Sequence, residues 1–270
     1  MTEREYRSHP AISRSELWKI RESPEKFKWY MEHPAPPSDA LVFGQLVHCL
    51  LLQPEKYDTD FFPMPDLNLR SALGRAERDA ILNECEKRGI TPVKPEQVAL
   101  ARLMAEKCRA DSDVAALLDG AHEQEFFWTD ELTGEDCKCR VDVLTEQDGK
   151  VTIVDFKSTA NAMTHAFVRD LYKYGYHFQS GMYCTGVKKC LGLDYLPRFI
   201  FIAQEKAAPF SLNRIELPED VILLGVDLFR EYLGIYHECK ETGIWYGYNG
   251  PYGENNEAYL LEWVKDGDDE

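Results

Sequence analysis

The sequence predicts an α/β domain that carries a helical addition at its N-terminus. Three observations lead to this class. Apolar residues repeat with the helical period of about 3.6 up to residue 120, and the period changes to 2 at Glu123. The remaining order is three strands, two helices, two strands and a helix, which is typical of α/β domains. We expect a single domain over 1–270, with a helical part (1–120), an α/β core (121–245) and an acidic tail (254–270).

Start and stop signals locate the helices of the first part. Ser13 and Glu16 form a capping box, and Ser23-Pro24 places a capping serine before a proline at the first helical position. Pro54 ends the next helix, and Gly89 closes the one after it. The longer helices expected here are 40–53, 71–88 and 95–110, followed by a short turn of helix after 112.

The core begins with three expected strands, which are joined by turns at Thr133-Gly134 and Asp148-Gly149. A long final helix carries an apolar stripe that includes Leu224, Leu228 and Tyr232. The expected strands are 123–129, 138–145, 151–157, 196–204 and 210–216, and the expected helices are 160–169, 173–191 and 218–241.

Composition restricts the class of protein. An aromatic content of 12% argues against disorder. No apolar run approaches the roughly 18 residues of a membrane span, and the N-terminus lacks an apolar signal core. We therefore expect a soluble cytoplasmic protein with no membrane partner. The eight cysteines contain no C-x-x-C pair, which argues against a zinc ribbon.

The net charge of −16 argues by itself against a polyanionic partner. The charge is uneven, however, because the last 17 residues hold seven acids and one lysine. An enzyme that holds DNA through bound metal ions also carries acids at its centre. Composition therefore leaves nucleic acid open as a partner.

The third expected strand ends in Asp155-Phe-Lys157, in which the two charged residues share one face. Four [D/E]-x-K matches occur in the chain, and only this one ends an apolar strand, where burying two charges is costly without partners. The plain alternative is a structural ion pair. On the neighbouring strand Lys138, Arg140 and Asp142 share one face, so pairing the strands would bring Asp142 close to Asp155. Two adjacent carboxylates favour Mg²⁺ or Mn²⁺.

These residues resemble a known signature. Asp142, Asp155-Phe-Lys157 and Gln179-Ser-Gly-Met-Tyr183 are similar to the D…(D/E)-x-K…Q-x-x-x-Y pattern of the RecB-like branch of the PD-(D/E)XK nuclease superfamily. Gly44-Gln-Leu-Val-His48 resembles the histidine helix of that branch. The closest resemblance is to the exonuclease VIII (RecE-type) nuclease domain of phage recombination systems, and it is carried by three further stretches. These are Ile12-Ser-Arg-Ser-Glu-Leu17 with Ser23-Pro24, Lys173-Tyr-Gly-Tyr-His-Phe-Gln179, and Gly243-Ile-Trp245.

The resemblance implies a restriction-endonuclease-like core, a central mixed sheet flanked by helices, and a role for each matched residue. Asp142, Asp155, the Phe156 carbonyl and His48 would ligate Mg²⁺, for which Mn²⁺ would substitute. Lys157 would orient or deprotonate the attacking water and stabilise developing charge. The iron–sulfur cysteines of some relatives are missing, because only Cys239 follows Cys190, so no iron–sulfur cluster is expected.

Several other residues allow more than one interpretation. Gln179 and Tyr183 lie one helical turn apart and would reach the phosphate or Lys157, or form a plain surface pair. Glu123 fits the acidic residue of the first strand better than Glu125 does. His48 alone would be a core histidine. The residues expected to contact DNA phosphates are Lys138, Arg140, Arg169 and Lys173.

The function implied by the resemblance is a Mg²⁺-dependent exodeoxyribonuclease that degrades one strand of linear duplex DNA, 5′ to 3′. It would leave a 3′ single strand for a single-strand annealing protein. A ring-shaped homo-oligomer would hold the DNA ends by enclosure, which suits the acidic charge. The alternatives are a RecB-like endonuclease or repair nuclease, and a catalytically inactive binding module.

Overall fold

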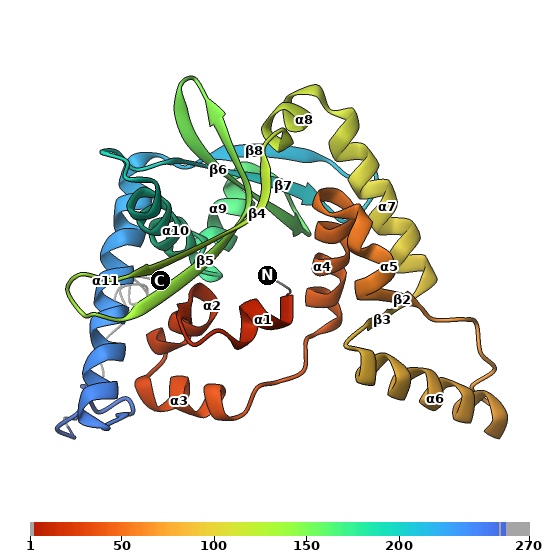
Figure 1. Ribbon diagram of the computed structural model, residues 1–270, viewed down its shortest axis with the longest axis horizontal. Coiled ribbons are helices and arrows are strands. Elements are labelled where there is room, and N and C mark those ends of the chain that lie inside the picture. Colours follow the sequence, from red (N-terminus) through yellow and green to blue (C-terminus); the bar gives the residue numbers. More distant parts are fainter. Residues whose placement is uncertain (1–2, 254, 258–270) are drawn as a thin grey trace, which may run out of the picture.

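A computed structural model describes residues 3–253 and 255–257 of the chain. Its centre is a mixed sheet in the order β1-β5-β6-β7-β8, with β4 paired to β5 (Figure 1). The strands of this sheet are β1 (Ile12–Ser13), β4 (Ala121–Thr129), β5 (Asp136–Gln147), β6 (Lys150–Thr159), β7 (Arg198–Glu205) and β8 (Leu212–Glu216). The predicted class, an α/β fold with a central mixed sheet and flanking helices, is confirmed.

The connections explain why the sheet is mixed. β5 and β6 pair antiparallel through a tight turn in which Asp148 and Gly149 both have positive φ. β6 and β7 are parallel, so the chain must cross over between them, and two helices make that crossover. β7 and β8 are antiparallel again.

The helices begin and end close to the predicted residues, with two shifts in the crossover. There the first helix begins at Thr164 rather than residue 160, because Thr159 and Asn161 bond to nearby backbone groups. The second begins at Tyr176, because Gly175 adopts a left-handed conformation. The helices are α1 (Glu3–Ser8), α2 (Arg14–Leu17), η1 (Trp18–Arg21), α3 (Pro24–Glu32), α4 (Asp39–Leu52), η2 (Pro54–Lys56), α5 (Tyr57–Asp60), α6 (Ala72–Arg88), α7 (Pro95–Ala110), α8 (Ser112–Leu118), α9 (Thr164–Lys173), α10 (Tyr176–Leu191) and α11 (Glu219–Thr242).

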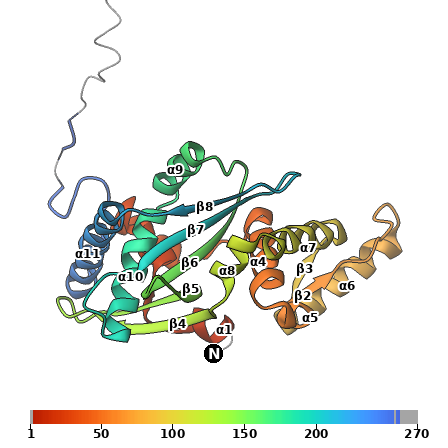
Figure 2. The same cartoon turned by 90° about the horizontal axis from the view of Figure 1, so that it is seen from above.

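Helices cover both faces of the sheet (Figure 2). On one face α4 and α7 pack against Val154 and Ile202. On the other face α9 and α10 pack against Ile153 and Phe201. Alternate residues of one strand therefore enter different cores, which agrees with the period of 2 in the sequence.

Two glycines allow close packing around α10. A Cβ on Gly181 would lie 2.0 Å from the Gly225 backbone carbon, so this pair lets α10 and α11 cross closely. Gly175, at the start of α10, has φ of 69°, and a Cβ there would lie 2.5 Å from the Trp18 ring. A side chain at position 175 would clash with Trp18, so either that ring or the start of α10 would have to move.

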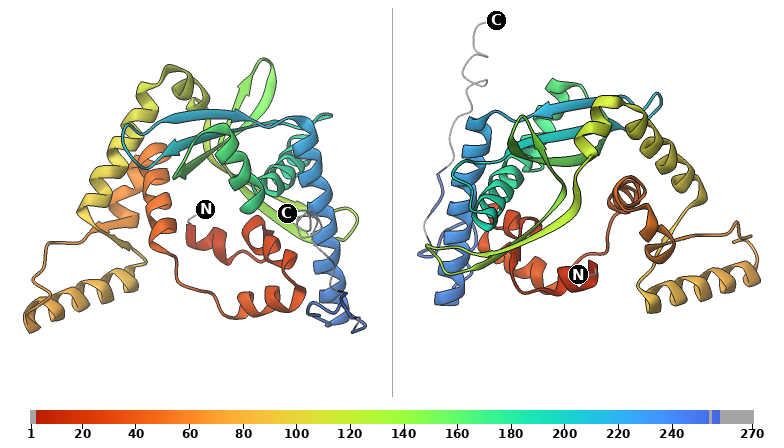
Figure 3. Two further views of the ribbon diagram at one scale, coloured as in Figure 1. Left: turned by 180° about the vertical axis from the view of Figure 1, so that it is seen from behind. Right: turned by 45° about the horizontal axis from the view of Figure 1, so that its top comes forward.

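A small outer unit stands away from the sheet. It consists of the parallel strands β2 (Phe61–Pro63) and β3 (Thr91–Val93) with α6 between them in sequence. Both views of Figure 3 show α6 at the margin of the molecule. The sequence analysis did not predict β1, β2 or β3, because strands of two or three residues are too short to show an alternating pattern.

Most of the predicted acidic tail, residue 254 and residues 258–270, lies outside the described residues. Over the part of the chain that is described, no helix combines the length and the apolar character that a membrane crossing requires.

Candidate metal centre

The site lies where one edge of β5 changes partners. Along this edge β5 pairs with β1 at Cys137 and Lys138 and with β6 from Val143 onward. Between these pairings the strands separate, and the Asp142 carboxylate accepts the Phe156 N–H at 2.8 Å. A side chain thus replaces a backbone acceptor and holds the Asp142 carboxylate against β6.

Asp155 and Lys157 share one face of β6, as predicted. Asp155 is almost completely buried, and one of its oxygens forms an ion pair with the Lys157 ammonium. The other oxygen accepts a hydrogen bond from the Gln179 amide of α10. A buried carboxylate requires such partners, so Gln179 and Lys157 together fix the Asp155 side chain.

His48 reaches the same place from α4. Its Nε2 lies 2.9 Å from Asp142 Oδ2 and 3.2 Å from the Phe156 carbonyl oxygen. Its Nδ1 lies 3.5 Å from Glu123 Oε1. The histidine is therefore turned toward two carboxylates and a carbonyl, which differs from the core histidine that the sequence left as an alternative.

Glu123 enters from β4 with an unusual backbone. Its φ is 48°, a region that non-glycine residues seldom adopt, and its neighbours His122 and Gln124 remain paired with β5. The Glu123 carboxylate lies between His48 and Arg140, whose Nε is 2.9 Å from Oε2. Glu125, the alternative in the sequence analysis, pairs across the ladder with Arg140 instead.

The acidities of these groups depend on one another. Burial would lower the pKa of His48, but Asp142 and Glu123 outweigh this effect and raise it well above its ordinary value. Burial opposes ionisation of Asp142, yet the His48 charge lowers its pKa overall. Burial and the nearby Asp142 charge raise the pKa of Asp155 to about 6. Asp155 and Asp142 keep the pKa of Lys157 raised despite its burial. The site therefore holds an imidazolium and an ammonium among three carboxylates.

His48, Glu123 and Asp142 have the arrangement of a metal site, and we call them the trio. Their ligating atoms all lie within 4.8 Å of one another. Two carboxylates and one imidazole could hold a divalent metal ion, and such an ion would replace the His48 proton. The sequence analysis expected Asp155 among the ligands. The structure brings Glu123 into the group and pairs Asp155 with Lys157 and Gln179, so ligation by Asp155 stays a prediction.

Tyr183 lies one helical turn beyond Gln179 on α10 and packs against Phe199, with the ring centroids 6.5 Å apart. Burial raises the pKa of its phenol well above the ordinary value, and the charges on Asp155 and Asp142 raise it further. The hydroxyl therefore stays protonated.

The four expected DNA contacts fall in different places. Lys138 is buried, and its ammonium donates to the carbonyls of Tyr6 and His9 at 2.8 and 2.7 Å, so the expectation that it contacts DNA is wrong. The reason is that α1 and β1 cover this end of β5. Arg140 borders the trio. Arg169 and Lys173 are exposed on α9, outside the trio.

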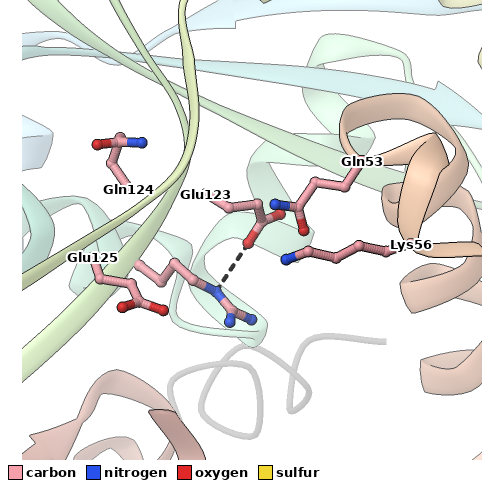
Figure 4. Close-up of a pocket in the computed structure, with 6 residues that line it drawn as sticks. Gln53, Lys56, Glu123, Gln124 and Glu125 are labelled. Carbon is pink, nitrogen blue, oxygen red and sulfur yellow. Dashed lines mark ion pairs between the residues drawn. The ribbon is translucent and has the colours of Figure 1, made fainter. Parts of the chain in front are cut away.

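Sequence reasoning missed three polar residues near the site. Arg14 donates to the Tyr174 carbonyl, and its buried Nε has no hydrogen-bond partner among the described residues. Gln53 and Lys56 follow the His48 helix and line a cavity of about 390 Å³ together with Glu123 (Figure 4). Arg14 stands inside a stretch that carried the resemblance, so its position was a usable signal. Gln53 and Lys56 carried no such signal in the sequence beyond their closeness to Pro54.

Comparisons with known proteins agree with this architecture. A family model described as a PDDEXK-like domain of unknown function (DUF3799) matches residues 13–252. Among solved structures, a candidate exonuclease from Eubacterium rectale is similar over 100% of this chain and 98% of that chain, with 14% identity and a TM-score of 0.64. At that identity the likeness shows a shared fold. The structure of SSO0001 matches 60% of this chain and 69% of that chain at 15% identity, and its TM-score of 0.30 supports no argument. No curated protein matches the chain.

Proposed function

The chain belongs to the family of PDDEXK-like domains designated DUF3799, and from this premise we propose that it is a divalent-metal-dependent exodeoxyribonuclease. One observation carries the proposal. The trio converges beside the Asp155–Lys157 pair at the point where β5 and β6 separate. A cation-binding group next to a fixed ammonium suits hydrolysis of a phosphodiester.

Each side chain has a part in this reaction. His48, Glu123, Asp142 and the Phe156 carbonyl would hold the cation, which supplies charge stabilisation and a more acidic water when bound. Lys157, held by Asp155, would orient the attacking water and stabilise the negative charge that develops on the phosphate. Gln179 keeps Asp155 in place, and the protonated Tyr183 offers a donor from the same helix face.

The finer proposals follow the resemblance described above. The enzyme would belong to the RecB-like branch and degrade one strand of linear duplex DNA, 5′ to 3′. Its 3′ single strand would pass to an annealing protein in recombination. The net charge of −16 supports a ring-shaped homo-oligomer, because enclosure would retain DNA without a strongly basic surface.

Digestion of three DNA substrates, one linear and end-labelled and two circular, tests the proposal. Linear duplex, nicked circle and closed circle are incubated with and without Mg²⁺, with Lys157→Ala as the matched control. We expect loss of the linear duplex only, from the 5′ ends, and only with Mg²⁺. Cutting of the closed circle would instead identify an endonuclease. No cleavage of any substrate with Mg²⁺ or Mn²⁺ would indicate an inactive binding module.

A further inference from the structure

A polar cavity opens directly beside the trio. It is about 390 Å³ in volume, and Figure 4 shows Gln53 and Lys56 reaching into it from the end of α4 and η2 while Glu123 enters from β4. The residues that line it are Gln53, Lys56, Glu123, Gln124, Glu125 and Arg140. Lysine and arginine are the side chains that bind phosphate groups, and a glutamine amide adds a neutral donor. The cavity therefore has the donors that a DNA phosphate requires.

Its charge does not yet favour a phosphate. Lys56 and Arg140 contribute two positive charges, while Glu123 and Glu125 contribute two negative charges. Arg140 Nε lies 2.9 Å from Glu123 Oε2, so its guanidinium is already engaged by a carboxylate. Binding a phosphate to Arg140 would have to replace this ion pair.

Glu123 belongs to both sites at once. While Oε2 contacts Arg140, Oε1 lies 3.5 Å from His48 Nδ1 inside the trio. Its strained backbone, with φ of 48°, holds the carboxylate between the two partners. A single carboxylate that lines the cavity and ligates a cation links the occupancy of the two sites.

We propose that the Glu123–Arg140 ion pair couples cation binding to DNA binding. Glu123 exchanges Arg140 for the cation when the trio is loaded, and Arg140 then joins Lys56 in binding a DNA phosphate in the cavity. Loading replaces the single charge of the His48 proton by the two charges of the cation and releases Arg140 from Glu123, so the phosphate meets a cationic site only after the cation is present. By thermodynamic linkage, DNA must strengthen cation binding by the same factor. The inference rests on the proposed function, because it takes DNA as the ligand.

Binding measurements test the coupling without cleavage. All variants are made in the Lys157→Ala background, and the anisotropy of a fluorescent duplex with 5′-hydroxyl ends is measured with and without Mg²⁺. In the background protein we expect Mg²⁺ to tighten binding by roughly 5- to 150-fold, the usual range of coupling between two ligands. Glu123→Gln should bind DNA more tightly without metal and lose most of the Mg²⁺ effect. Arg140→Gln should also lose the Mg²⁺ effect, because its affinity for DNA should not rise when the cation binds.

Two control variants separate the coupling from general electrostatics. Glu125→Gln removes a charge from the same cavity but leaves the trio intact, so it should shift affinity equally with and without Mg²⁺. Lys56→Gln should weaken binding and, in the presence of Mg²⁺, lower the salt slope by about one. A direct reading comes from NMR of the arginine Nε–H groups, where the Arg140 signal should shift on adding Mg²⁺ without DNA and should not shift in Asp142→Asn.

The outcomes distinguish this inference from the proposed function. The coupling is overturned if Arg140→Gln keeps the full Mg²⁺ effect, or if Glu123→Gln binds metal-free DNA no more tightly than the background protein. If either result accompanies normal cleavage by the wild type, only the coupling is lost. If the background protein binds no DNA at any Mg²⁺ concentration and the wild type cleaves none, the proposed function fails together with it.

Discussion

Two clusters in this molecule bury charge, and they solve the problem differently. In the turn of the β4–β5 hairpin, Glu135 is buried and both of its oxygens are paired, one with His237 Nδ1 at 3.0 Å and one with Lys240 Nζ at 2.6 Å. We call these three residues the hairpin cluster. It joins the hairpin to α11 and is complete with the side chains of the chain itself.

The candidate metal centre is not complete in this sense. Its three carboxylates, Glu123, Asp142 and Asp155, meet two permanent cations in Lys157 and Arg140. The remaining positive charge is a proton on His48, which a metal ion can replace. The comparison teaches that one buried carboxylate with a permanent ammonium beside it is satisfied by the chain alone, whereas a cluster with more carboxylates than permanent cations has room for a cationic ligand. Three predictions test this distinction, and a fourth concerns exposed cations outside both clusters, in order of decreasing effect.

The largest effect is expected from Lys157→Ala. Removing a group that stabilises developing charge costs about 10²–10³ in rate, while cation binding should be retained because lysine is not a ligand. The measurement is single-turnover cleavage of end-labelled duplex, together with the Mg²⁺-induced rise in melting temperature. A variant that cleaves at the wild-type rate would show that the Asp155–Lys157 pair is structural after all.

The next effect is stabilisation of the fold by metal. A cation that binds only the folded protein stabilises it by about 2.7 kcal/mol at 100 times its Kd. Mg²⁺ or Mn²⁺ should therefore raise the melting temperature of the wild type, and Asp142→Asn should abolish the rise. His48→Gln should retain part of it and require more Mn²⁺. Asp155→Asn decides whether Asp155 is a further ligand, since an undiminished rise would remove it from the metal shell.

A smaller effect is expected in the hairpin cluster, and it depends on pH. Burial opposes ionisation of Glu135, but Lys240 and His237 outweigh it and lower its pKa below the ordinary 4.5. The stabilisation is therefore present above about pH 4.5 and is lost as the pH falls through the depressed value. Glu135→Gln should cost about 1–3 kcal/mol at pH 7 and little at acid pH.

Urea unfolding at pH 7 and pH 3 measures this difference. Glu131→Gln is the matched control, because Glu131 lies on the same hairpin but is exposed and pairs with Lys189 at 3.2 Å. An exposed pair contributes about 0–1 kcal/mol, so the control should change little at either pH. Equal losses for Glu135→Gln at both pH values would contradict the assigned role of its charge.

The smallest effect concerns the exposed cations of α9. Arg169→Gln and Lys173→Gln should each weaken DNA binding uniformly across sequences and lower the salt slope by about one, if each side chain contacts a phosphate. Anisotropy across a salt series measures the slope. An unchanged slope in either variant would place that residue outside the DNA path, as the structure already does for Lys138.

Much of the fold and part of the site could be predicted from local pattern. The change of period at Glu123 and the signals at Ser23, Pro54 and Gly89 located most elements, because helix and strand periods and caps depend on near neighbours. The strand period of 2, which also depends on near neighbours, placed Asp155 and Lys157 on one face of a strand. Gln179 could be assigned to the face of a helix, but the carboxylate that it meets could not be derived from spacing.

Contacts between distant segments decided the rest. The choice of Glu123 over Glu125 for the trio depends on a positive φ and on where β5 lies, and neither follows from residue type. Lys138 was expected on the surface because its strand face is polar, yet its ammonium donates to Tyr6 of α1, 132 residues away in sequence. The sequence by itself determined which residues share a face, since that follows from backbone period. Only the tertiary structure decided which faces meet, because that depends on how helices and strands from distant parts of the chain pack together.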